Sequence, residues 1–209
     1  MRTSTRTSVA TFRVLFGAIW LVDAFFKWQP GFRNGFAAQL RDMVGAQPAI
    51  VKPWFQFWAF LATGTGQAVP DVIAVTETAL GIALILGVAR RPVYIAGAVY
   101  ALMVWAVGEG FGGPYALGMS TDVGAALIYV FVFAGLWMLD PRGVAPRWSL
   151  DRVITQARPG WMRIAELRLS RGAHPKALSR ESDDGFVFAR EAVAVSLDEG
   201  RIPRSGLRR

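Results

Sequence analysis

The sequence predicts an all-α integral membrane protein: a four-transmembrane-helix bundle with extracytoplasmic surface helices and a basic cytoplasmic tail. Of its 209 residues, 53% are hydrophobic and only 18% are charged, against roughly 25% charged residues in an average soluble domain. Four apolar stretches reach the length of about 20 residues that a bilayer-spanning helix needs. The positive charge is concentrated in the C-terminal third of the chain.

The four spans are predicted at about 9–28, 70–89, 92–109 and 120–139. Proline is tolerated in the first turn of a helix, which suits Pro70 and Pro92 at the starts of the second and third spans, and Ser120 is a candidate N-cap for the fourth. The first stretch follows a basic N-terminus, as a secretory signal does. It is too long for one, however, and no small-residue cleavage site follows it, so we interpret it as a retained span.

The segment 30–69, between the first two spans, is predicted to lie at the outer surface of the membrane. Apolar residues recur at steps of three and four through 31–44, which indicates an amphipathic helix. Five aromatic residues then crowd into 54–60, and such rings favour the headgroup region. We expect one or two short helices here, with the aromatic side chains either capping the bundle or contacting a ligand.

The orientation and the tail follow from the basic residues. Residues 1–140 carry nine Lys and Arg against seven Asp and Glu, whereas residues 141–209 carry fourteen against eight. Basic residues precede the first span, join the second to the third and follow the fourth, which places both termini in the cytoplasm. We expect the tail 141–209 to be partly disordered or docked on a partner, with a candidate surface helix over about 153–169. It suits anionic lipid headgroups or other membrane-protein subunits, and its lack of interleaved aromatics argues against nucleic acid.

Ionisable residues within the spans are the main functional signal, because a charge at the membrane centre costs about 2.5–3.5 kcal/mol on insertion scales. Four helices contribute such residues, all predicted to lie in the outer half of the bilayer: Asp23, Lys27, Glu77, Glu109 and Asp122. Of these we take Glu77, Asp23, Lys27 and Glu109 as candidate catalytic residues. Trp28, Tyr100 and Tyr115 are candidate cofactor-binding side chains, since they offer rings or hydroxyl groups nearby.

Each of these residues also has a purely structural interpretation. Asp23 and Lys27 stand four residues apart in the favourable order for an intrahelical pair. Asp122 suits the first turn of the fourth span, where its charge would offset the helix dipole. Glu109 lies at the membrane–water boundary, where its carboxylate would be solvated. Glu77 is the exception, because no basic residue lies within four positions of it. Inside the bilayer Glu77 must therefore be protonated, be paired with Lys27 of the first span, or face a polar cavity.

Cysteine and histidine usage limits the redox chemistry. The chain has no cysteine and a single histidine, which excludes disulfides, thiolate-bound zinc, iron–sulfur clusters and bis-histidine haem. No metal site is therefore predicted, and no cofactor is encoded by the sequence itself.

Two stretches resemble the DoxX/DoxD family of four-helix membrane proteins: Asp23-Ala-Phe-Phe-Lys27-Trp28, and Glu77-Thr-Ala-Leu-Gly81 continuing to Gly87. The resemblance, over about residues 8–140, implies the cytoplasmic membrane of a prokaryote. DoxD-type members form the small subunit of thiosulfate:quinone oxidoreductase, and DoxX-type members associate with membrane oxidoreductase complexes. The resemblance thus implies a quinone-interacting component of an oxidoreductase or electron-transfer assembly.

Two hypotheses remain open. In the first, the protein is a quinone-reactive enzyme subunit in which Glu77, Asp23 and Glu109 supply protons while Lys27 steadies an anion. In the second, it is a non-catalytic accessory or scaffold subunit of a larger energy-transducing membrane complex. A small-solute carrier is the weaker third option, because no inverted repeat is detectable.

Overall fold

The computed structural model describes residues 2–113, 123–140, 146 and 148–167; for residues 2–6 it describes the backbone only. The chain divides into two compact units, Met1–Leu169 and Ser170–Arg209, and all described residues belong to the first. Most of these residues are helical, and none of them forms a strand. Asp122, Ser120, Tyr115 and His174 lie outside the described residues, as does most of the predicted tail.

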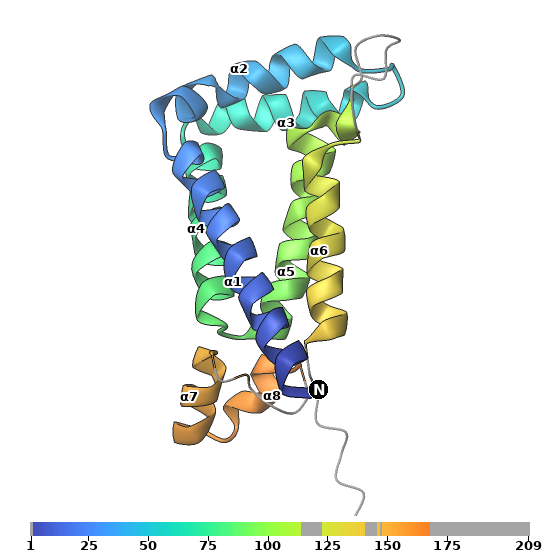
Figure 1. The fold of residues 1–209 in the computed structure, drawn as a ribbon. Helices are drawn as coiled ribbons and strands as arrows, with labels where there is room; N and C mark the ends of the chain where they lie inside the picture. The colour runs from blue at the N-terminus through green and yellow to red at the C-terminus, as the bar shows by residue number, and fades with distance from the viewer. Residues whose placement is uncertain (1, 114–122, 141–145, 147, 168–209) are drawn as a thin grey trace, which may run out of the picture. The chain divides into compact units, whose positions relative to one another are not determined.

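The long helices run in two pairs (Figure 1). Helix α1 (Arg2–Lys27) packs along α4 (Ala68–Leu86), and α5 (Arg90–Met103) packs along α6 (Ala125–Leu139). Helix α5 continues into the π-helical turn η1 (Val104–Gly108). A second short turn, η2, covers Gly110–Gly112.

Three of these helices are long and apolar enough to cross a membrane: Thr7–Lys27, Ala68–Leu86 and Arg90–Gly108. Helix α6 is equally apolar but has only 15 residues, about 22 Å at 1.5 Å per residue. It begins at Ala125 rather than at the predicted Ser120, because Gly124 adopts φ 92°, a conformation that residues with a side chain rarely take. The first three predicted spans thus coincide with candidate membrane helices, whereas the fourth stays a prediction.

Close contact between helices depends on small residues. A Cβ atom placed on Gly17 of α1 would lie 2.9 Å from the carbonyl oxygen of Gly81 in α4, so the two backbones touch at these glycines. Gly97 of α5 leaves room for the ring of Phe133 in α6 in the same way. In lipid, packing of this kind replaces the hydrophobic drive that joins helices in water.

An aromatic core joins the two pairs of helices. Phe16 and Trp20 of α1 lie edge-on or tilted against Tyr129 and Phe133 of α6, with ring centroids 5.0–5.9 Å apart. Trp20 also meets Tyr100 of α5 at 5.8 Å. Phe133 is fully buried, and Trp20 is nearly so. Such ring contacts stabilise beyond the area that they bury.

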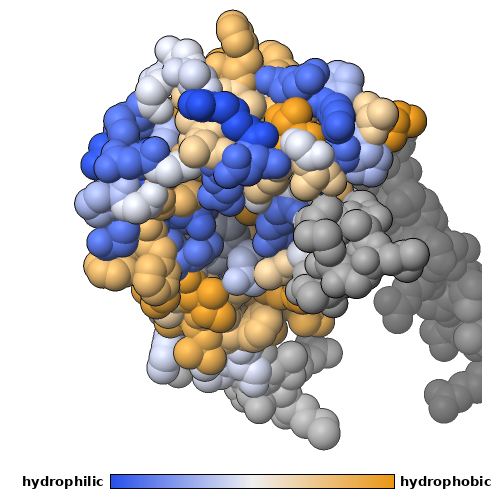
Figure 2. All heavy atoms as spheres, turned by 90° about the horizontal axis from the view of Figure 1, so that it is seen from above, coloured by the Kyte–Doolittle hydropathy of each residue, from blue (hydrophilic) through white to orange (hydrophobic). Residues whose placement is uncertain are grey.

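Two further helices cross one end of the bundle (Figure 1): α2 (Pro30–Ala46) and α3 (Lys52–Thr65). Each has a proline in its first turn. They bury Phe36 and Leu40 of α2 against Ala59 and Ala62 of α3, together with Val107 of η1. Seen from this end, hydrophilic residues cover much of the surface (Figure 2), whereas α3 exposes the aromatic side chains of Phe57 and Phe60.

The opposite end carries α7 (Leu150–Ala157) and α8 (Trp161–Ala165), which follow the fourth long helix. The segment predicted as a cytoplasmic tail from residue 141 therefore contains ordered helices. Their hydrogen bonds to the turn between α4 and α5 place them in the same unit as the bundle.

Candidate functional site

A cavity of about 600 Å³ lies between the two helix pairs, beneath α2 and α3. Its volume falls within the roughly 300–1,000 Å³ typical of small-molecule sites. Every long helix contributes to it, as do α2 and α3. Its lining residues are Trp20, Asp23, Lys27, Phe32, Phe36, Gln39, Trp58, Ala68, Val69, Val72, Ile73, Glu77, Tyr100, Met103, Val104, Val107, Gly108, Glu109, Ala125, Ala126 and Tyr129.

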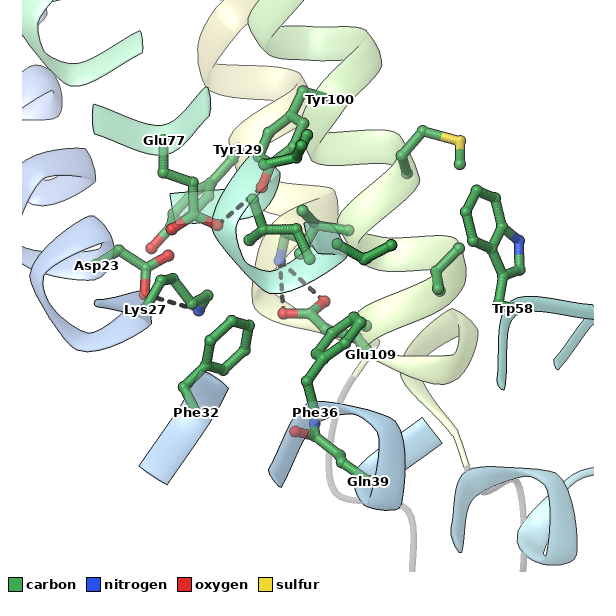
Figure 3. Close-up of a pocket in the computed structure, with 18 of the residues that line it drawn as sticks. Asp23, Lys27, Phe32, Phe36, Gln39, Trp58, Glu77, Tyr100, Glu109 and Tyr129 are labelled. Carbon is green, nitrogen blue, oxygen red and sulfur yellow. Dashed lines mark hydrogen bonds and ion pairs between the residues drawn. The ribbon is translucent and has the colours of Figure 1, made fainter. Parts of the chain in front are cut away.

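The walls of the cavity are mostly apolar. Phe32 and Phe36 reach in from α2 and Trp58 from α3 (Figure 3), while Val72 and Ile73 of α4 add aliphatic surface. A chamber of this kind accommodates a flat or hydrocarbon-rich body, and the few polar groups in it decide how that body is oriented.

Glu77 is the most deeply buried of these polar groups, with 1% of its surface exposed. Tyr100 donates its hydroxyl to Oε1 at 3.0 Å (Figure 3). Within the described part of the chain, no donor reaches the buried Oε2 atom. Buried polar atoms nearly always have a hydrogen-bond partner, so the cavity presents an unused acceptor.

Asp23 and Lys27 form the second polar element, on α1. Lys27 Nζ donates to Asp23 Oδ1 at 3.3 Å across one turn of the helix (Figure 3). The same ammonium group lies 5.1 Å from the centroid of the Phe32 ring, close enough for a cation–π contact. Asp23 keeps 38% of its side chain exposed, so it remains available to a ligand in the cavity.

Glu109 has a different role from these three. Both of its carboxylate oxygens accept the backbone N–H of Ala126, at 3.1 and 3.0 Å. This N–H is one of the unpaired donors at the N-terminus of α6, where a negative charge is also favoured by the helix dipole. Glu109, between η1 and η2, therefore caps α6 while lining the cavity.

The structure thus brings five of the predicted site residues to one cavity: Glu77, Asp23, Lys27, Glu109 and Tyr100. Trp28 is not among the residues that line it. Its indole N–H donates to the Thr78 hydroxyl at 3.1 Å on the exposed surface of the bundle, where it ties α1 to α4.

Sequence reasoning missed Trp20 and Tyr129, which lie at the aromatic end of the cavity. Within the described residues, no acceptor meets the buried indole N–H of Trp20. One signal was available, since Trp20 precedes Asp23 by three residues and Lys27 by seven, the spacing of one helix face. Tyr129 was also detectable, as the one hydroxyl-bearing side chain in Ala125–Leu139.

The charges in the cavity restrict its ligands. Asp23, Glu77 and Glu109 supply three carboxyl groups against the single ammonium group of Lys27, and that group already binds Asp23. An anion entering here would meet more negative than positive groups in a medium of low dielectric constant. The cavity therefore favours a ligand that is neutral or cationic and that donates hydrogen bonds.

Among the described residues, no group of three or more His, Cys, Asp and Glu side chains is arranged to hold a metal ion. Comparison of the chain with protein-family models, with curated proteins and with solved structures finds no match.

Proposed function

We propose that this protein is a DoxX-like membrane component of an oxidoreductase or electron-transfer assembly, and that its cavity binds the head group of a lipid-soluble quinol or quinone. The observation that carries the proposal is the free, buried Oε2 atom of Glu77 in an aromatic-walled cavity. A quinol hydroxyl is a donor that matches this acceptor, and the aromatic walls match the ring.

The charges of the cavity argue against binding of thiosulfate, the substrate that the family resemblance suggests. Thiosulfate is an anion, and Asp23, Glu77 and Glu109 would oppose it. We therefore assign the quinol or quinone to this cavity and leave any anionic substrate to a partner subunit.

Proton transfer is the part of the reaction that these residues would perform. Oxidation of a quinol releases two electrons and two protons. In quinol oxidation Glu77 would accept one hydroxyl proton as a general base, and Asp23, which is paired with Lys27 on α1, would receive the second. The two electrons would pass to a redox centre of a partner subunit that is reduced by two electrons as the quinol becomes a quinone. In the reverse reaction, reduction of a quinone, the same carboxyl groups would supply the two protons.

We further propose four spans in the cytoplasmic membrane of a prokaryote, with α6 completing the fourth and the α2–α3 end outside. The turn between α4 and α5 contains Arg90 and Arg91, and Arg152, Arg158 and Arg163 follow α6. An excess of basic residues at the end of the bundle opposite α2 and α3 supports a cytoplasmic position for that end.

The test is the ligand content of the protein purified in mild detergent. We expect mass spectrometry to find a quinone or quinol near one equivalent, and Glu77→Gln to lose most of it. Asp42→Asn is the matched control, because Asp42 is exposed on α2 and does not line the cavity. Native protein that carries no quinone, and takes none up when quinol is added, would contradict the proposal.

The accessory role is the second candidate, and the exposed aromatic face of α3 favours it. Phe57 and Phe60 are 56% and 78% exposed, and a neighbouring membrane subunit would bury them. A stable large complex that forms equally well with Glu77→Gln, but dissociates with Phe57→Ser/Phe60→Ser, would support this role over the quinol site.

A further inference from the structure

The α7–α8 segment exposes apolar side chains at the end of the bundle opposite α2 and α3. Trp148, Leu150 and Val153 are 66%, 37% and 60% exposed, and Ile164 of α8 is 56% exposed. In α7 the positions 150, 153, 154 and 157 share one face of the helix. Within the described residues nothing covers this face.

The opposite side of α7 is fastened to the bundle through Asp151, which is completely buried. Its Oδ1 accepts the backbone N–H of Ala89 at 2.7 Å and the indole N–H of Trp161 at 2.8 Å. Its Oδ2 accepts the backbone N–H of Arg90 at 3.2 Å and the Arg90 guanidinium Nε at 3.1 Å. One carboxylate thus joins α7, α8 and the start of α5.

The two residues just before Asp151 are also hydrogen-bonded to the bundle. The Ser149 hydroxyl donates to the carbonyl oxygen of Gly87 at 2.6 Å, and Arg13 of α1 donates to the carbonyl oxygen of Trp148 at 2.6 Å. Arg90 also pairs with Asp140 at the end of α6. Because the buried side is fixed to these helix ends, α7 cannot rotate its apolar face inward.

Exposed arginine side chains belong to the same segment as the apolar face. Arg152, Arg158 and Arg163 are all exposed in the same segment. Arginine guanidinium groups bind phosphate oxygens in a bidentate geometry, and the aliphatic part of the arginine side chain packs against hydrocarbon. An apolar face on one side of a helix, with exposed cations on the remaining surface, is the pattern of a helix lying in a membrane interface.

We propose that the α7–α8 segment lies on the bilayer surface, with Trp148, Leu150, Val153 and Ile164 in the headgroup–acyl boundary and its arginines on anionic lipid phosphates. Two features favour lipid over a protein partner. The segment is hydrogen-bonded to Gly87 and Ala89, directly after the end of α4, and the helices ending on this side expose apolar residues such as Leu86 of α4 and Met138 of α6. It also combines apolar side chains with cations rather than with mixed charges. The inference needs only membrane insertion, so it does not depend on the quinol site.

The experiment uses the absence of cysteine from the full chain. A nitroxide label is attached at Leu150→Cys on the apolar face, or at the control position Gln156→Cys, about 120° away around the helix. Each protein is reconstituted in vesicles of phosphatidylcholine, with or without phosphatidylglycerol. Collisions with oxygen and with a water-soluble nickel chelate then report the depth of each label.

We expect the Leu150 label to be oxygen-accessible and protected from nickel, more so with phosphatidylglycerol, and the Gln156 label to be the reverse. Replacement of the three arginines by glutamine should abolish the phosphatidylglycerol effect while leaving helix content unchanged. Equal nickel access at both positions in both lipids would overturn the proposal. Protection of Leu150 in native membranes but not in vesicles would overturn it in favour of a protein partner.

Discussion

At the scale of single residues, Glu77 depends on its neighbours because, within the described part of the chain, one hydrogen-bond donor serves its two buried oxygens. Tyr100 is that donor, at 3.0 Å. Removal of one partner of a buried polar group costs about 1–3 kcal/mol. The stability of this part of the bundle is therefore coupled to the group that gives the cavity its chemistry.

Replacement of Tyr100 by phenylalanine should destabilise the ligand-free protein by about 1–2 kcal/mol, because it leaves both Glu77 oxygens without a donor among the described residues. The double variant Tyr100→Phe/Glu77→Leu should recover part of the loss, since no polar group is then stranded. Thermal unfolding in detergent measures both. Losses that simply add in the double variant would mean that the two side chains do not interact.

The Asp23–Lys27 pair leads to a second prediction at this scale. Asp23→Asn strands the Lys27 ammonium group, whereas Asp23→Asn/Lys27→Met removes both charges. We expect the single variant to be less stable than the double variant by about 1 kcal/mol, a modest value because the side chains are partly exposed. Unfolding curves for the four proteins of the cycle decide it, and a double variant less stable than Asp23→Asn would rule out the pairing.

At the scale of helices, the closest contact is the crossing of α1 and α4 at Gly17 and Gly81. A methyl group on Gly17 would lie 2.9 Å from the Gly81 carbonyl oxygen and from Leu84 Cβ, so the helices would have to separate. We expect Gly17→Ala to cost about 1–3 kcal/mol. Gly135→Ala in α6 is the matched control, because nothing lies within 4 Å of its added methyl group; it should be neutral or stabilising.

The fastening of α7 is the second prediction for an element. Asp151→Asn exchanges a carboxylate that accepts four hydrogen bonds for an amide that faces its donors with an NH₂ group. We expect a loss of about 3 kcal/mol and earlier proteolytic cleavage within 150–165 than in the native protein. Asp42→Asn is again the control, and equal cleavage rates in all three proteins would show that Asp151 does not hold the segment.

Sequence reasoning succeeded for features whose cause is local. The i, i+4 order of Asp23 and Lys27 predicts their pairing, and the apolar surroundings of Glu77 mark it as a residue that needs a partner. Features that require a second helix were not visible. Gly17 is an ordinary glycine until Gly81 lies opposite it, and Glu109 caps α6 across a gap in sequence of 17 residues.

At the scale of the whole molecule, the orientation in the membrane is the prediction that connects all other features. Single cysteines at Thr65, near the end of α3, and at Gln156 of α7 lie at opposite ends of the bundle. We expect a membrane-impermeant maleimide to label Thr65→Cys in intact cells and Gln156→Cys only after permeabilisation. The reverse pattern would invert the topology and place the cavity on the cytoplasmic side.

The most direct test of the central claim is a titration of the reconstituted protein with short-chain quinols, followed by quenching of tryptophan fluorescence. Trp20 and Trp58 line the cavity and should report an occupant. We predict saturable quenching, with affinity reduced roughly tenfold or more by Glu77→Gln, about 1.4 kcal/mol, and unchanged by Asp42→Asn. Equal affinities for the native and Glu77→Gln proteins, or no saturable quenching, would contradict the assignment of Glu77 as the group that binds the quinol.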